Sequence, residues 1–220
     1  MKTVKAALAL VVLLLAALGA SAQGPTPNVE DFFKLLPERY VTHEGDYGRL
    51  ETLSDAPNGY LAIRDTTAGG AARPVFEFAL YESADGDRLF VVANTRYDHA
   101  CHSFETFFLR HDGRGWGDAG PGVMPPLTPS NFFPDRAAAA LVGRHEGWQS
   151  YLRHRPSRRG ATLEVSLELC DVAVENDLRL NERERARLAS LLARRPPSIT
   201  LRWNRREAKF EFARPGRNKK

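Results

Sequence analysis

Residues 73–81 alternate strictly between two sides of an extended chain, and this period of two constrains the fold more than any other feature. Phe76, Phe78 and Leu80 fall on one side, which indicates a strand that buries one face of an antiparallel sheet. Asp85-Gly86 in the connection that follows is a strong hairpin signal. Five runs have the length of strands, at residues 49–53, 60–65, 73–81, 88–97 and 103–110. The turns between them are short, which predicts an antiparallel meander.

Short helices are expected around these strands. Asn28 is a helix cap with Asp31 at the third helical position, so residues 29–36 are predicted to form a helix that Pro37 ends. The segment 113–134 is rich in Gly and Pro and is expected to hold no regular element. Beyond it the pattern predicts a helix at residues 135–142 and a strand at 163–169. A second helix at 181–195 and a closing hairpin at 199–212 follow.

These elements predict an α+β fold of mainly antiparallel sheets with a few short helices, arranged as two sheet-plus-helix lobes. The N-terminal lobe, residues 23–120, would contain the first helix and the meander. A Pro-rich connection at 121–134 would join it to a basic C-terminal α+β lobe at 135–220. The composition, 43% apolar and 26% charged, excludes collagen, a coiled coil and a polytopic membrane protein.

The first 22 residues have the pattern of a signal peptide. Lys2 and Lys5 precede an unbroken apolar run at 6–18, and small residues at Ala20 and Ala22 fit signal peptidase, with cleavage near Ala22. As a helix, the run rises only about 20 Å, which is too short for a hydrocarbon core of about 30 Å. We therefore expect a periplasmic or secreted protein whose mature chain has no transmembrane segment.

Export decides how the two cysteines are interpreted. In an oxidising compartment a lone pair of cysteines most often forms a disulfide, so Cys101 and Cys170 are predicted to be bonded to each other. The alternative is two separate thiols. With only two cysteines, a disulfide-dense scaffold and a four-cysteine zinc site are both excluded.

One cluster, Asp98 to His102, carries candidate metal ligands. Imidazole and thiolate suit zinc or copper, so His99, Cys101 and His102 are the candidates. An extended segment places His99 and Cys101 on one face and His102 on the other, and an oxidised Cys101 could not serve as a ligand. The competing interpretation is a polar turn with a structural cysteine and no bound cofactor.

Charge is distributed unevenly along the chain. Residues 23–135 hold 9 basic and 17 acidic groups, whereas residues 136–220 hold 20 and 10. In one interpretation the two halves simply face each other or solvent; in the other, the second half meets an anionic envelope component such as lipid headgroups. The candidate contacts for such a partner are Arg153, Arg155, Arg158, Arg159 and the basic tail 214–220. Nucleic acid is not expected, because the chain lacks an aromatic, basic platform on which bases stack.

Sequence motifs of catalysis are absent. The chain has no Gly-x-Ser-x-Gly nucleophile elbow, no phosphate-binding loop and no dinucleotide fingerprint. Gly113-Arg114-Gly115 is glycine-rich but leads into the Pro-rich segment rather than into a helix. The sequence therefore favours a non-catalytic binding or accessory protein of unknown ligand, with a metal-binding protein and a binder of anionic surfaces as the alternatives.

The order of short patterns in the chain resembles an uncharacterised family of exported Gram-negative proteins. The resemblance covers most of the mature chain, and it implies a two-part α+β fold with curved antiparallel sheets. It brings no catalytic residues. The patterns that carry it are Leu35-Leu36-Pro37, Asn58-Gly59-Tyr60-Leu61, Val91-Val92-Ala93-Asn94-Thr95 and Ile199-Thr200-Leu201-Arg202-Trp203.

Overall fold

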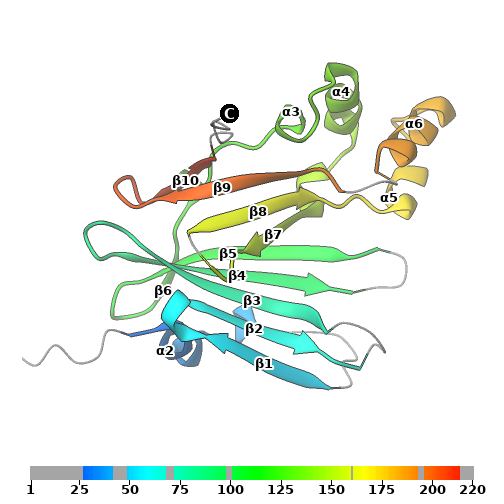
Figure 1. Ribbon diagram of the computed structural model, residues 1–220. Helices are drawn as coiled ribbons and strands as arrows, with labels where there is room; N and C mark the ends of the chain where they lie inside the picture. The colour runs from blue at the N-terminus through cyan, green and yellow to red at the C-terminus, as the bar shows by residue number, and fades with distance from the viewer. Residues whose placement is uncertain are drawn as a thin grey trace, which may run out of the picture.

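A computed structural model of the protein describes residues 27–41, 49–67, 72–97, 101–159, 161–192 and 196–213. Two antiparallel sheets and several short helices form the α+β fold that the sequence predicts (Figure 1). The expected signal peptide lies outside these ranges. No helix within them has the length and hydropathy needed to cross a bilayer.

The first sheet is a six-stranded meander in which each strand pairs with its neighbour in sequence. Its strands are β1 (Leu50–Asp55), β2 (Tyr60–Asp65), β3 (Arg73–Glu82), β4 (Arg88–Arg96), β5 (Ser103–His111) and β6 (Trp116–Asp118). The five predicted strands are confirmed, and β6 is the addition. Three residues beside a glycine-rich turn are too few to show a period of two, so β6 could not be predicted from the sequence.

Helix α2 (Val29–Leu35) covers one face of this sheet. Asn28 and Asp31 form the predicted capping box at its start. Phe32 packs on the buried Phe90, with 6.0 Å between the ring centroids, and the Trp116 indole donates a hydrogen bond to the Leu35 carbonyl. Short 3-10 turns follow α2 and β1, at η1 (Glu38–Tyr40) and η2 (Ala56–Asn58).

The second sheet has four antiparallel strands in the order β10-β9-β8-β7. They are β7 (Leu152–Pro156), β8 (Thr162–Leu167), β9 (Ser198–Asn204) and β10 (Lys209–Phe212). The sequence did not predict β7 because Arg153-His154-Arg155 shows no alternation of apolar and polar residues. Pro156 is tolerated because β7 is an edge strand, where a missing backbone donor breaks no ladder.

The Pro-rich segment is more ordered than expected. Residues Pro121–Val123 form the 3-10 turn η3, and Pro129–Phe132 form a short helix, α3. The expectation of no regular element was wrong because Pro121 and Pro129 stand at the starts of these two elements, where the missing N–H has no partner to lose. The remaining helical elements are α4 (Arg136–Arg144), η4 (Trp148–Tyr151), α5 (Asp171–Glu175) and α6 (Glu182–Leu192).

The second sheet covers the other face of the meander, so β3 is buried on both sides rather than on one. Tyr81 points away from α2, and its ring packs against Trp203 and Phe210 of the second sheet. Its hydroxyl donates to the Thr162 carbonyl over 3.0 Å, and Trp203 donates to the Glu82 carbonyl over 2.9 Å. Side chains from both sheets and from α3, α4, α5 and α6 therefore belong to one apolar cluster.

Candidate functional site

The two cysteines are joined, as predicted. Cys101 lies two residues before β5 and Cys170 directly precedes α5, and their Cα atoms lie 5.4 Å apart across the disulfide. The bond links the first sheet to the segment that follows β8. The Cys101 sulfur is consequently not a thiolate and cannot donate to a metal ion while the bond is intact.

The candidate metal cluster is only partly described, because Asp98 and His99 lie outside the described ranges. The imidazole of His102 packs edge-on against the Tyr97 ring, with 5.0 Å between the centroids. Its Nδ1 is buried and has no hydrogen-bond partner among the residues that the structure describes. Within the described ranges no three His, Cys, Asp or Glu side chains come together as a metal-binding group.

Arg153, one of the four predicted contacts for an anionic partner, is buried at 6% exposure. Its guanidinium lies over the Phe104 ring, donates to the Tyr97 hydroxyl over 3.2 Å and approaches the Glu168 carboxylate at 3.6 Å. A charge buried with these partners is costly to expose, so Arg153 belongs to the interior between the sheets.

The other three predicted arginines reach the surface. Arg155 and Arg159 are exposed. Arg158 donates from Nε to the Asp55 carboxylate over 2.8 Å, which ties the β7–β8 turn to the end of β1. This hydrogen bond holds the pKa of Asp55 below its usual value. The four residues therefore do not form one surface.

A layer of polar groups lies where β7 crosses the first sheet. Tyr60 donates a hydrogen bond to Glu77 over 2.8 Å, and burial raises the pKa of Glu77. On β7, Nδ1 of His154 lies 3.1 Å from the Thr106 hydroxyl, and its ring meets Phe108 edge-on. Burial lowers the pKa of His154 to about 4.

The buried histidine predicts a loss of stability in acid. As the pH falls below 6.5, the unfolded chain binds a proton at His154, whereas the folded chain does so only near pH 4. Stability therefore falls between these values, by up to about 1.4 kcal/mol per pH unit from this group. Denaturant unfolding across this range should show a shallower pH dependence in His154→Gln, and an unchanged slope would contradict the assignment.

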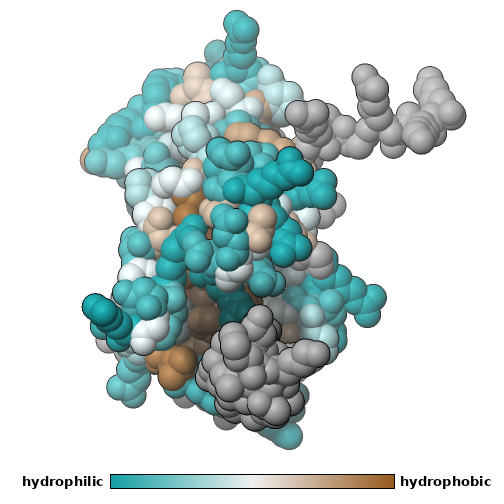
Figure 2. Space-filling model, turned by 90° about the vertical axis from the view of Figure 1, so that its left-hand side faces the viewer, coloured by the Kyte–Doolittle hydropathy of each residue, from teal (hydrophilic) through white to brown (hydrophobic). Residues whose placement is uncertain are grey.

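An open basic hollow lies beside the β9–β10 hairpin, with a volume of about 720 Å³. The residues that line this basic hollow are Ala161, Arg202, Trp203, Asn204, Arg205, Arg206, Glu211, Phe212 and Ala213. A smaller hollow of about 440 Å³ shares Ala161, Trp203 and Arg205 with it. Figure 2 faces the side on which the β3–β4 and β9–β10 turns lie, and hydrophilic residues cover most of the described surface there.

Local hydrogen bonds fix the hairpin beside the basic hollow. The Asn204 side chain accepts from the backbone N–H groups of Arg206 and Glu207, and so closes the turn. The Arg205 carbonyl accepts a hydrogen bond from Ala84 over 2.7 Å, which attaches the turn to the β3–β4 connection. The arginines therefore stand on a fixed backbone.

The charge of the basic hollow is not compensated. Arg202, Arg205 and Arg206 are exposed, and none of them forms an ion pair with any described residue. The one carboxylate in its wall, Glu211, accepts a hydrogen bond from the Asn204 amide. Three guanidinium groups around one concavity attract an anion.

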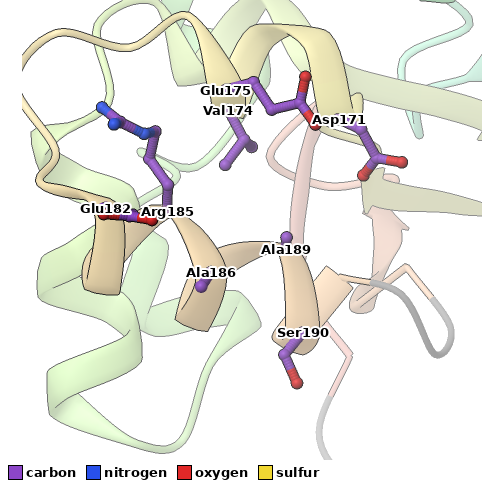
Figure 3. Close-up of a pocket in the computed structure, with 8 residues that line it drawn as sticks. All are labelled: Asp171, Val174, Glu175, Glu182, Arg185, Ala186, Ala189 and Ser190. Atoms are coloured by element: carbon purple, nitrogen blue, oxygen red, sulfur yellow. The ribbon is translucent and has the colours of Figure 1, made fainter.

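A groove of about 520 Å³ separates α5 from α6 (Figure 3). Val174, Ala186 and Ala189 supply apolar side chains, and carboxylates surround them. The only cation in its lining, Arg185, donates to the backbone carbonyls of Leu180 and Asp177. The groove is thus acidic, in contrast to the basic hollow.

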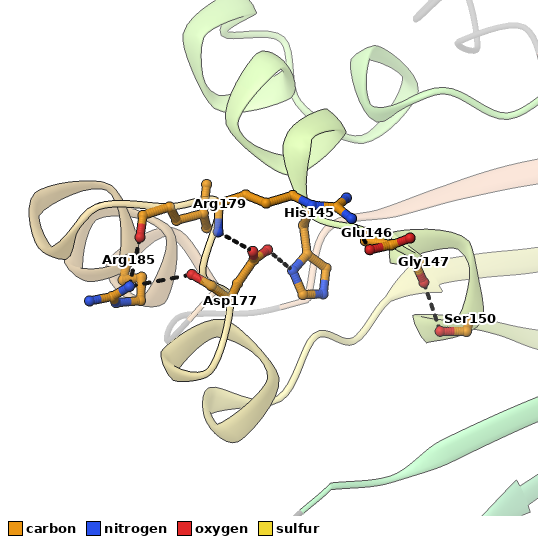
Figure 4. Close-up of polar contacts among 8 residues, drawn as sticks. His145, Glu146, Gly147, Ser150, Asp177, Arg179 and Arg185 are labelled. Atoms are coloured by element: carbon orange, nitrogen blue, oxygen red, sulfur yellow. Dashed lines mark hydrogen bonds and ion pairs between the residues drawn. The ribbon is translucent and has the colours of Figure 1, made fainter.

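A buried histidine–aspartate pair lies at a fourth concavity, of about 370 Å³ (Figure 4). Nδ1 of His145 is 2.5 Å from Oδ2 of Asp177, and both side chains are only 7% exposed. Burial alone would raise the pKa of Asp177, but hydrogen bonds from the Arg179 backbone and from His145 hold it below its usual value. Nε2 of His145 is buried and has no partner in the described structure.

The sequence patterns did not identify the basic hollow or the His145–Asp177 pair. Arg202 alternates with the apolar Leu201 and Trp203, and this pattern could have placed it on the outer face of β9. No pattern relates His145 to Asp177, which are 32 residues apart and meet only because the turn after α5 folds back on the end of α4.

No protein-family model, curated protein or solved structure matches this chain. The resemblance to an exported family therefore stays a prediction, and the side chains described above bear on function by their chemistry alone.

Proposed function

We propose that this chain is an exported, non-catalytic binding protein whose basic hollow contacts the anionic headgroups of envelope lipids. The observation that carries the proposal is the set of three exposed arginines around one concavity, none of which pairs with a carboxylate of the described residues. Guanidinium groups bind phosphate oxygens through paired hydrogen bonds, so a phosphate-bearing headgroup fits this chemistry.

The distribution of ion pairs supports an external anionic partner. Among the described residues, only Arg158–Asp55 and Arg187–Asp135 join the basic half of the chain to its acidic half. In the described part of the chain, few basic groups of residues 136–220 are therefore paired with carboxylates of the first half. An unneutralised basic surface attracts anions over a distance set by the ionic strength.

Phe212 favours a lipid surface over free phosphate. It lines the basic hollow and is 43% exposed, so an apolar ring stands beside the arginines. Proteins that lie on a bilayer combine basic groups, which meet the headgroups, with aromatic groups, which enter the acyl boundary. A free phosphate ion has no apolar part that could contact the ring.

The disulfide supports export, since such bonds persist in oxidising compartments and are rare in the cytosol. A periplasmic or secreted location after cleavage near Ala22 is part of the proposal. The metal-binding alternative is weaker than the lipid proposal, because the Cys101–Cys170 bond occupies one of its three candidate ligands.

Reversing two charges at the basic hollow tests the proposal. Each basic residue near an anionic surface contributes about 1 kcal/mol, so Arg205→Glu/Arg206→Glu is expected to weaken binding to phosphatidylglycerol vesicles at least tenfold. Sedimentation with these vesicles at low and moderate salt measures the effect. Binding by the unchanged protein should decrease as salt increases and should be absent with phosphatidylcholine alone.

A matched control has the same change in net charge. Arg136 and Arg183 are exposed, have no ion pair in the described structure and stand in the first turns of α4 and α6, where Glu is well tolerated. Arg136→Glu/Arg183→Glu should bind far better than the hollow variant. If both variants lost the same amount of vesicle binding, the effect would come from net charge alone. If the protein bound inorganic phosphate but not vesicles, its ligand would be a free anion. Either result overturns the proposal.

A further inference from the structure

The cavity at His145 is independent of the basic hollow and has a rigid frame. His145 caps the end of α4, where its N–H donates to the Val142 carbonyl. Asp177 opens the turn after α5, and Arg185 of α6 donates to the Asp177 and Leu180 carbonyls at the two ends of that turn. The imidazole and the carboxylate are therefore positioned by three helices (Figure 4).

The aspartate decides which imidazole nitrogen is available. Because a carboxylate accepts, the Asp177 contact keeps a proton on Nδ1 of His145. In the neutral imidazole, Nε2 is then an acceptor, and it is buried without a partner in the described structure. A buried acceptor left without a hydrogen bond is unfavourable, so a hydroxyl donor that reaches Nε2 gains that free energy on binding.

The cavity wall selects a neutral ligand. Glu146 and Arg179 in the wall form an ion pair with each other, and Asp177 adds a further negative charge. The Asp177 carboxylate is occupied by Nδ1 of His145 and by the Arg179 backbone N–H, so the wall leaves no unpaired charge for an ionic ligand. Tyr151 and Leu178 offer apolar surface, while the Asn176 amide can both donate and accept. A ring that carries hydroxyl groups matches this combination of groups.

The Arg179–Glu146 ion pair lies beside His145 in the wall of the cavity. Figure 4 shows the Arg179 side chain running past His145 to reach Glu146. The two side chains are 52% and 77% exposed, and ion pairs this exposed contribute little to stability. Opening the pair therefore costs little free energy.

We propose that this cavity binds a neutral, sugar-sized polyhydroxyl ligand, with Nε2 of His145 accepting a hydrogen bond from one of its hydroxyls. The volume of about 370 Å³ lies within the usual range of small-molecule sites and holds a single hexose ring. His145 is a binding residue here, and Asp177 is a positioning residue that fixes its tautomer.

The test is titration of the disulfide-intact protein with glucose, galactose and N-acetylglucosamine, followed by calorimetry and by the ring ¹⁵N signals of His145. At least one sugar should bind and shift the Nε2 signal. His145→Gln and Asn176→Ala should each weaken binding at least tenfold. Asn176 is exposed and leaves the His145–Asp177 pair intact, so its variant keeps the test valid if His145→Gln unfolds.

Two further variants complete the experiment. Gln149→Ala, an exposed neighbour outside the cavity wall, should bind as the unchanged protein does. Glu146→Gln opens the ion pair and should not weaken binding. No binding by any of the three sugars, binding that His145→Gln and Asn176→Ala leave unchanged, or binding of glucose 6-phosphate in preference to glucose would each overturn the proposal.

Discussion

Replacing Cys101 and Cys170 with serine should lower the free energy of unfolding by roughly 4 kcal/mol. The disulfide closes a loop with a sequence separation of 69 residues, and closing such a loop reduces the conformational entropy of the unfolded chain. The loop runs from the β4–β5 connection through β5, α4 and the first strands of the second sheet, so the bond joins the two sheets covalently.

Denaturant unfolding with and without reductant measures this contribution. Reductant should shift the midpoint of the unchanged protein toward that of the Cys101→Ser/Cys170→Ser variant and should have no effect on the variant. Titration of the denatured, unreduced protein should find no free thiol. Two reactive thiols, or equal midpoints with and without reductant, would contradict the predicted stabilisation.

Truncating Phe210 should cost about 3–5 kcal/mol, the usual penalty for removing a fully buried aromatic ring. Phe210 is 1% exposed and packs against Tyr81 of the first sheet at 4.9 Å and Trp203 of the second at 5.1 Å, between ring centroids. Phe212, two residues along the same strand, is the matched control. It is 43% exposed, so Phe212→Ala should cost less than about 1 kcal/mol.

The same experiment reports whether the sheets unfold together. Trp116 belongs to the first sheet and Trp203 to the second, so single-tryptophan variants follow each sheet by fluorescence. Because Phe210 lies in the shared cluster, Phe210→Ala should lower the midpoint of both signals equally. A lower midpoint for Trp203 alone would mean that the sheets are separate folding units.

Much of the local structure could be predicted. The alternation of Phe76, Phe78 and Leu80 and the Asp85-Gly86 turn identified the β3–β4 hairpin, since each depends on neighbouring residues only. The capping box at Asn28 identified α2 for the same reason. β7 could not be predicted, because its basic residues form a strand only where Arg153 finds Tyr97, Phe104 and Glu168 in the tertiary structure.

The candidate sites were largely beyond sequence reasoning. The pairing of Cys101 with Cys170 followed from their number and the expected compartment, not from their surroundings. The candidate arginines came from the run 153–159, of which Arg153 is interior, and the exposed arginines that surround one concavity are Arg202, Arg205 and Arg206. The exposure and the ion pairing of a side chain depend on the residues that the fold places around it. The order of residue types along the chain does not show which residues those are.

The sequence by itself determined the α+β class, the antiparallel meander and the pairing of the cysteines. These follow from side-chain period, turn chemistry and cysteine count, which are properties of short segments or of composition. Only the tertiary structure decided that the second sheet covers the first, that Arg153 is buried and that His145 meets Asp177. Those outcomes depend on contacts between residues far apart in the chain, and such contacts form only when apolar surfaces of both sheets are removed from water together.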